Sequence, residues 1–182
     1  MTTVPDNDVT RLVSYLKYQA KKEPAAIRGL VQGGHDSLLS VLDGITEEQA
    51  RFKPSDDIWS ALEVLEHVVT GKHEVFRLCT GLAHGKAYKG VGPDEEKAAI
   101  QDGVTRVHFE SLADARSATE SEHAEQLTFI ASISPETDVE ARYSHFIFGA
   151  LNCREWAVFQ RVHDLDHGNQ IEQVKAAPGY PG

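Results

Sequence analysis

Apolar residues recur at helical spacing along most of the chain. A short amphipathic segment over residues 8–22 is followed by a longer stripe that starts at Pro24 and ends at Gly44. Proline suits the first turn of a helix, where its missing N–H is not needed, and glycine often terminates a helix. The apolar positions are Val9, Leu12, Leu16 and Ala20 in the first segment, and Ile27, Val31, Gly34, Leu38 and Leu42 in the second.

Three further apolar stripes predict helices over about residues 59–80, 109–133 and 151–175. No segment shows a convincing strand alternation, and long helices without strands pack as a bundle. We therefore expect an all-α, four-helix bundle over residues 24–176. An extra short helix lies in a predicted N-terminal extension over residues 1–23, and residues 177–182 form a tail.

The connection between the second and third bundle helices predicts the topology. It spans roughly 28 residues, far more than the 2–8 that usually join antiparallel neighbours. A link of this length can cross the bundle, so that two successive helices run parallel. We expect up-down-down-up order; the alternative is a surface loop without a crossover. Ser55, Asp56 and Asp57 offer N-terminal caps for the second bundle helix.

The last predicted helix carries His163 and His167 one turn apart. Residues at i and i+4 share a helix face with their Cβ atoms about 6 Å apart, so two imidazoles there can bind one metal ion. This face also carries large aromatic residues, so we expect both histidines to point into the core and Asp164 to point outward. The alternative is a metal-free polar network of the histidines with Gln160 and Gln170.

His67 lies on the second bundle helix at the margin of its apolar arc, and Gly71 leaves space beside the ring one turn later. A lone histidine at such a margin is more often a satisfied boundary residue. Facing the pair on the last helix, however, it becomes a third ligand. His67, His163 and His167 would then form a metal site with open positions, as catalytic metal sites do. The HExxH protease motif does not fit, because Asp164 stands where its glutamate would be.

Further polar residues have inward positions on the third bundle helix and just before the last one. Thr119, His123 and Gln126 share the apolar stripe of the helix at 109–133, where they either line a pocket or satisfy one another in the core. His145 precedes the last helix, and it serves either the site or the packing of its own loop. We treat all four as candidate pocket residues.

The last helix offers two more candidates beside the histidine pair. Asp166 leans inward, so it either orients a ligand histidine from behind or is an exposed helix charge. Gln170 lies on the histidine face and is a candidate partner for a ligand ring. The other histidines are expected at the surface or at its boundary: His35, His73, His84 and His108.

The charge of the chain limits its partners. With 18 basic and 28 acidic residues the formal net charge is −10, and no basic cluster is longer than Lys21-Lys22. We therefore expect no nucleic-acid partner, because proteins bind the negative phosphate backbone through basic surfaces. The N-terminus lacks a signal-peptide pattern, and no apolar stretch approaches the ~18 residues of a membrane span. We expect a cytoplasmic protein without a membrane partner.

Cys79 and Cys153 lack CxxC spacing, a pattern that suits a reducing cytosol and gives no redox motif. If His67 faces His163 on antiparallel helices, Cys79 lies about 18 Å beyond His67, and Cys153 lies about 15 Å from His163 in the same direction. We therefore predict that both thiols lie at one end of the bundle, too far from the ion to be ligands.

Three segments resemble the DinB/YfiT-like family of metal-binding bundles, over about residues 25–175. Residues 52–67 are similar to its run of Pro, Trp-Ser and a leucine-rich turn ending in the first ligand histidine; residues 145–156 resemble the stretch before its last helix; residues 163–171 match its H-x3-H-x2-Q-I. The resemblance implies an up-down-down-up bundle, a homodimer and one divalent ion, zinc or nickel. Its three ligands are carried over here as His67, His163 and His167.

The resemblance also implies a chemistry, since the family includes thiol-S-transferases that use bacillithiol and mycothiol-dependent maleylpyruvate isomerases. We expect a metal-dependent transferase for a small-molecule substrate, with a low-molecular-weight thiol as possible cosubstrate. A bound metal makes a thiol or a water nucleophilic near neutral pH. A metal-dependent hydrolase and a non-enzymatic, stress-related metal-binding module stay open as alternatives, and no side chain stands out as a catalytic base.

Overall fold

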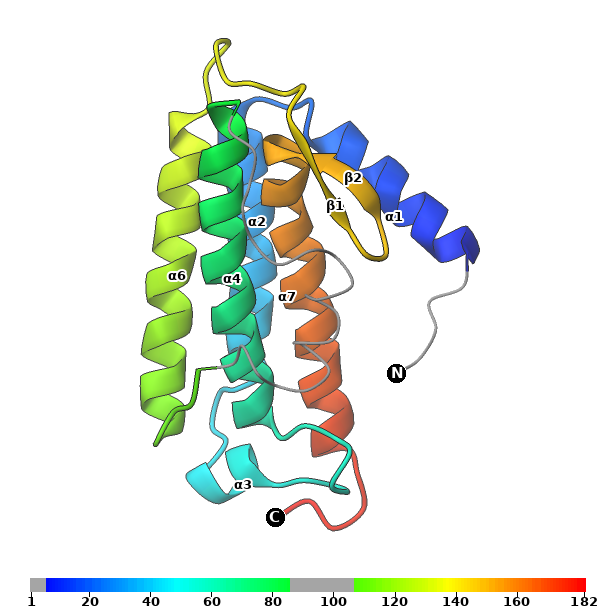
Figure 1. Cartoon of the computed structure of the whole chain (residues 1–182). Coiled ribbons are helices and arrows are strands. Elements are labelled where there is room, and N and C mark those ends of the chain that lie inside the picture. The colour runs from blue at the N-terminus through cyan, green and yellow to red at the C-terminus, as the bar shows by residue number, and fades with distance from the viewer. Residues whose placement is uncertain (1–5, 86–106) are drawn as a thin grey trace.

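The computed structural model describes residues 6–85 and 107–182, so the middle of the predicted crossover connection lies outside the described residues. The described part is mostly helical, with one small hairpin, and the predicted all-α fold is confirmed (Figure 1). Its elements are α1 (Asp6–Gln19), α2 (Pro24–Ser40), α3 (Glu47–Arg51), α4 (Ala61–Ala83), α6 (Leu112–Ser132), β1 (Arg142–His145), β2 (Gly149–Asn152) and α7 (Cys153–Lys175).

Helices α2, α4, α6 and α7 lie side by side as the bundle, and α1 rests against α7 (Figure 1). Helices α4 and α6 run parallel, because in two contacts the earlier residue of α4 meets the earlier residue of the α6 segment. The backbone N–H of Phe109 donates to Glu66 Oε1 at 3.1 Å, and His73 Nδ1 lies 3.3 Å from Glu122 Oε1. Since α6 is the next helix after α4 among the described residues, the up-down-down-up order of the bundle is confirmed.

Helices α4 and α7 run antiparallel. His67 contacts His163 near the middle of the bundle, and further along α4 the Cys79 thiol donates to the Cys153 carbonyl oxygen at 3.3 Å. Both thiols are buried at the same end of the bundle, where α4 ends and α7 begins. The predicted placement of the two cysteines is therefore confirmed.

The start of α4 fixes where His67 falls on the helix. Ser60 is the N-cap: its hydroxyl accepts from the Glu63 N–H, and the Glu63 carboxylate accepts from the Ser60 N–H. Such a capping box satisfies two backbone donors at once. The prediction that Ser55, Asp56 or Asp57 caps this helix was wrong, because these residues form a separate turn, closed by the Ile58 N–H donating to the Ser55 carbonyl, and the helix begins only after Ser60.

A short antiparallel hairpin, β1 and β2, precedes α7 and was not predicted. Its register pairs Arg142 with Asn152 and His145 with Gly149, and Gly149 adopts a φ of 69° where β2 begins. Each strand has only four residues, and most of their side chains are exposed or half-buried. A stretch this short carries too little alternation to separate it from a loop.

The interior has two apolar clusters with polar residues between them. One cluster lies at the end of the bundle near the hairpin and includes Leu82 and Trp156; the other lies at the α3 end and includes Leu65 and Ile171. We call the buried polar side chains between them the core polar layer. Its members are His35, Lys72, Thr119, His123, Gln126, Gln160 and Asp164.

Candidate metal centre

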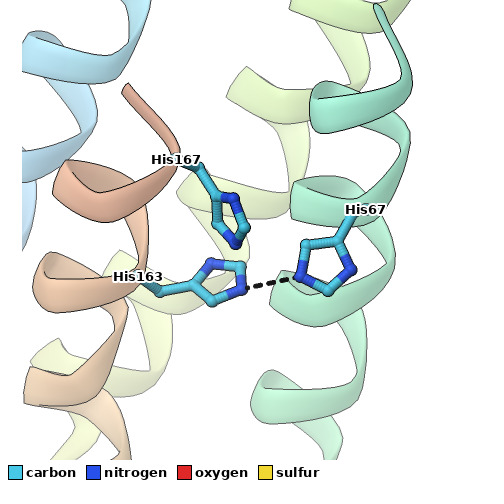
Figure 2. A group of neighbouring side chains, drawn as sticks. All are labelled: His67, His163 and His167. Carbon is cyan, nitrogen blue, oxygen red and sulfur yellow. Dashed lines mark hydrogen bonds between the residues drawn. The ribbon is translucent and has the colours of Figure 1, made fainter. Parts of the chain in front are cut away.

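Three imidazoles converge between α4 and α7. One ring nitrogen from each of His67, His163 and His167 lies within 4.8 Å of the other two. Figure 2 shows the His67 ring reaching from α4 toward the two rings on α7. The ring centroids are 5.2 Å apart for His67 and His163, 4.7 Å for His67 and His167, and 4.4 Å for the pair on α7. The spacing of these histidines in the sequence therefore produces one compact cluster.

One pair of nitrogens in the cluster has the separation that a shared ion requires. Nε2 of His67 and Nε2 of His163 are 3.3 Å apart, the contact drawn as a dashed line in Figure 2. Two imidazole ligands of one tetrahedral zinc ion, each about 2.0–2.1 Å from it, are themselves roughly 3.3 Å apart. The donor set and the geometry both fit a divalent transition metal.

Gly71 on α4 allows the His163 ring to come this close. A Cβ placed on Gly71 would lie 3.2 Å from His163 Cε1 and 3.4 Å from its Nε2. The sequence indicated that Gly71 leaves space beside the cluster, and this space is filled by the ring of His163. Any side chain at residue 71 would press against that ring.

Gln170 fixes the orientation of one ligand. His167 Nδ1 lies 2.9 Å from the Gln170 side-chain oxygen, which can only accept, so Nδ1 carries the proton and donates. The lone pair of His167 is thereby left on Nε2, the nitrogen available to a metal. Gln170, a candidate partner for a ligand ring, thus contacts His167. Histidines that bind a metal through one ring nitrogen commonly donate a hydrogen bond from the other.

Burial favours the neutral form of the two cluster histidines on α7. Removal from solvent lowers the pKa of His163 well below its ordinary value, and the neighbouring His167 and His67 lower it further. Burial also lowers the pKa of His167, an effect that its bond to Gln170 partly offsets. Neutral imidazole is the form that binds metal ions, so burial favours the ligating state of His163 and His167.

Aromatic side chains flank the cluster on both sides. The Trp59 ring lies 5.1 Å from the His67 ring, and the Phe159 ring lies 5.5 Å from the His163 ring, measured between centroids. Trp59 immediately precedes the Ser60 cap, and Phe159 is one turn before His163 on α7. The apolar surroundings lower the local polarity and strengthen electrostatic interactions at the site.

One of the two aspartates between the ligand histidines is placed opposite to expectation. Asp164, predicted to point outward, is fully buried, and its Oδ2 accepts from the Lys72 ammonium at 2.7 Å. Asp166 is exposed, which agrees with the second of its two interpretations, an exposed helix charge. The reason is that α7 contacts α1, α2 and α4, so the side of α7 that carries Asp164 also faces a neighbour.

Burial acts on both members of the Lys72–Asp164 pair. It lowers the pKa of the Lys72 amine and raises the pKa of the Asp164 carboxyl, and each partner offsets part of the other's shift. Lys72 was not singled out from the sequence, yet it falls on the apolar stripe of α4 between Val68 and Val75. A lysine on such a stripe was a signal for a buried ionic partner.

The candidate pocket residues on α6 are buried, and they belong to the core polar layer. Thr119 donates to the Ala115 carbonyl at 2.7 Å, and Gln126 donates to the Gln160 side-chain oxygen at 2.9 Å. His123 stacks on His35, with ring centroids 3.8 Å apart and planes within 8° of parallel.

His35 was expected at the surface or its boundary, and this was wrong, since it is 4% exposed. It continues the apolar stripe of α2 between Val31 and Leu38, a signal that the sequence did contain.

His145 is a buried part of the hairpin. Its Nδ1 accepts from the backbone N–H groups of Ile147 and Phe148, so it helps to shape the turn. Its ring centroid lies 4.9 Å from that of Phe159, which in turn contacts His163. Burial lowers the pKa of His145 to about 4. Packing of its own loop is thus one role of this residue, and it lies one aromatic ring away from the histidine cluster.

The fold and the cluster together define a four-helix bundle with a three-histidine centre between antiparallel helices. The chain belongs to the DinB superfamily, whose family model matches residues 31–171. The uncharacterized protein YuaE of Bacillus subtilis (strain 168) is 25% identical over 142 residues, which cover 74% of this chain and 88% of that protein. No solved structure matches the chain.

Two further expectations concern membranes and the oligomeric state. Within residues 6–85 and 107–182, no helix combines the length and the apolar character needed to cross a bilayer. The homodimer that the family resemblance implies stays a prediction.

Proposed function

We propose that the protein binds one divalent metal ion, zinc or nickel, through His67, His163 and His167, and that it catalyses a transfer reaction with a low-molecular-weight thiol. The observation that carries the proposal is the convergence of three imidazole nitrogens within 4.8 Å of one another. Imidazole donors suit zinc and nickel, and three protein ligands leave positions for a substrate. Membership of the DinB superfamily supports the same ligand set.

A divalent ion held by neutral ligands keeps its full charge and lowers the pKa of a thiol or a water that reaches its open positions. The chain's own side chains prepare this chemistry. Gln170 holds the His167 ring, and the contact with Gly71 holds the His163 ring. Trp59 and Phe159 provide apolar surface beside the ligands, on which the organic part of a small electrophile can pack.

The position of Asp164 favours a thiol over water as the nucleophile. Hydrolysis by water is helped by a carboxylate or imidazole that takes up its proton. Asp164, the carboxylate next to His163 in the sequence, is buried against Lys72 and is committed to that ion pair. A thiol ionises more readily and has less need of such a base. Metal-dependent hydrolysis and binding without turnover are the outcomes that the test has to separate from transfer.

The test offers bacillithiol, mycothiol and glutathione in turn, each with a generic thiol-reactive electrophile, to protein with and without metal. We expect conjugation or isomerisation above background with at least one thiol, lost on metal removal and in His67→Ala. His73→Ala, an exposed histidine on the same helix, is the matched control and should behave as wild type. If calorimetry detects no binding of these thiols to metal-loaded protein, the transferase proposal fails. Ester or amide cleavage would then favour the hydrolase.

A further inference from the structure

A second group of possible ligands lies inside the core polar layer, apart from the three-histidine cluster. His35 on α2, His123 on α6 and Asp164 on α7 are all buried, and one ligand atom from each lies within 4.8 Å of the other two. We infer that these three side chains form a second binding site for a divalent transition-metal ion. The inference does not depend on the proposed thiol chemistry.

Unsatisfied polar atoms indicate that this site has a ligand. His35 Nδ1, His123 Nδ1 and Asp164 Oδ1 are buried without a hydrogen-bond partner. Leaving a buried donor or acceptor unsatisfied costs about 1–3 kcal/mol each, so native structures rarely leave one such atom on each of three neighbouring side chains. One metal ion would satisfy the two nitrogens and the oxygen at the same time.

A glutamine orients one ligand here, as Gln170 does in the first site. His123 Nε2 lies 3.1 Å from the Gln32 side-chain oxygen, an acceptor, so Nε2 carries the proton. The lone pair of His123 is then on Nδ1, the atom without a partner. Burial lowers the pKa of His123 to about 3 and that of His35 to about 4, so both rings are neutral at neutral pH.

The donor set selects the kind of ion. Two imidazoles and one carboxylate suit iron, cobalt, nickel or zinc in the divalent state, whereas magnesium and calcium prefer ligands that are all oxygen. The three residues come from three helices of the bundle, so an ion here would tie α2, α6 and α7 together. The first site joins α4 and α7 instead.

Binding requires one ring to turn. The planes of His35 and His123 are within 8° of parallel and their centroids are 3.8 Å apart. An ion between them would lie about 1.9 Å out of each plane, too far for either lone pair when the metal–nitrogen distance is about 2.0–2.1 Å. Because Gln32 holds His123, His35 is the ring that rotates, and this torsion has a broad range in histidine. Metal binding therefore breaks the ring stack.

Lys72 makes the second site the weaker one. Its ammonium occupies Asp164 Oδ2 and leaves Oδ1 for an ion, but the two positive charges repel each other. Lys72→Met removes this repulsion and leaves the buried Asp164 charge in need of a new counter-ion. We therefore expect Lys72→Met to bind the second ion at least tenfold more tightly, whereas Asp164→Asn or His123→Gln should abolish binding.

The experiment is a Co²⁺ titration of the full chain, followed by visible absorption and calorimetry. Wild type should take up a second ion per chain after the first, and His123→Gln should take up only the first. The His67→Ala/His163→Ala/His167→Ala variant removes the first site and should retain one ion at the second. His73→Gln is the control for binding at a surface histidine and should leave both ions in place.

The outcomes separate this site from the first one. A second ion that survives His123→Gln, or that disappears in His73→Gln, would overturn the inference, as would a wild type that saturates at a single ion. The titration of wild type and His123→Gln decides the matter even if the triple variant does not fold. If wild type and His123→Gln each bind one ion and the triple variant binds none, the first site is supported and the second is rejected.

Discussion

The ring of His163 on α7 lies against the backbone of α4 at Gly71, where a Cβ would come within 3.2 Å of His163 Cε1 and 3.4 Å of its Nε2. Real Cβ atoms seldom approach a neighbour this closely. The glycine therefore has a specific task, which is to let a ligand ring approach the helix that carries His67. A side chain introduced at residue 71 would therefore displace the His163 ring.

Gly71→Ala should weaken metal binding with little loss of fold stability. Alanine favours the helix by up to about 1 kcal/mol relative to glycine, which offsets part of the strain of its contact with the His163 ring. The ring must shift by a few tenths of an ångström, so we expect metal affinity to fall roughly tenfold, about 1.4 kcal/mol. Calorimetric titration of the metal-free proteins measures this.

Gly29→Ala is the matched control for the helix effect. Gly29 is also in a bundle helix, and a Cβ there would meet nothing within 4 Å. We expect this variant to gain stability of about 0.5–1 kcal/mol and to keep its metal affinity. Equal metal affinities in both glycine variants and wild type would contradict the role assigned to Gly71.

Removal of the metal should lower the stability of wild type. The ligands lie on α4 and α7, far apart in the sequence, so only the folded chain brings them together. An ion that binds only the folded state adds about 2.7 kcal/mol when its free concentration is about 100 times Kd. A chelator should therefore lower the Tm of wild type and have much less effect on His67→Ala. Equal shifts in the two proteins would exclude His67 as a ligand.

The Lys72–Asp164 pair should matter most when only one partner is lost. Both side chains are 0% exposed, so Asp164→Asn leaves a buried ammonium without its counter-charge. We expect a loss of about 3–5 kcal/mol in the free energy of unfolding, measured with denaturant in the presence of a chelator. Lys72→Met/Asp164→Leu replaces the pair by apolar groups and should recover most of the free energy of unfolding that Asp164→Asn loses. A mild effect of Asp164→Asn would show that the pair is not isolated from water.

His145 should make the fold sensitive to acid. Its pKa falls from 6.5 to about 4 on folding, so between these values the unfolded chain binds more protons and stability decreases as the pH falls. This contribution is complete above pH 6.5, and its loss amounts to about 3 kcal/mol once the pH has dropped through about 4.

The corresponding variant is His145→Gln, measured without metal across that range. Its free energy of unfolding should fall less steeply with acid than that of wild type. His35 and His123 will still contribute to the slope in both proteins, because burial lowers their pKa values too. Identical slopes in the two proteins would mean that His145 is accessible to water.

Much of the architecture was predictable because it depends on local patterns. The helical stripes located the bundle helices to within a few residues, and the long connection before α6 indicated the crossover. The spacing of His163 and His167 placed both rings on one face. Short elements were missed, since the hairpin strands and α3 have four and five residues and carry little periodic signal.

The buried polar residues were harder to predict, for a physical reason. Whether a charge can be buried depends on its partner, and the partner of Asp164 is Lys72, which is 92 residues away in the chain. The same holds for His35, whose ring stacks on His123 from another helix. Position on an apolar stripe could have identified Lys72 and His35 as buried, but only the fold identifies their partners.

The most direct test of the metal centre is elemental analysis of protein that was purified without a histidine tag and dialysed thoroughly. Dialysis should remove an ion held only by the weaker second site. We predict close to one zinc or nickel ion per chain in wild type and in His73→Ala, and almost none in the His163→Ala/His167→Ala variant. Absence of metal from wild type, or an equal content in wild type and the double variant, would contradict the assignment of His67, His163 and His167 as ligands.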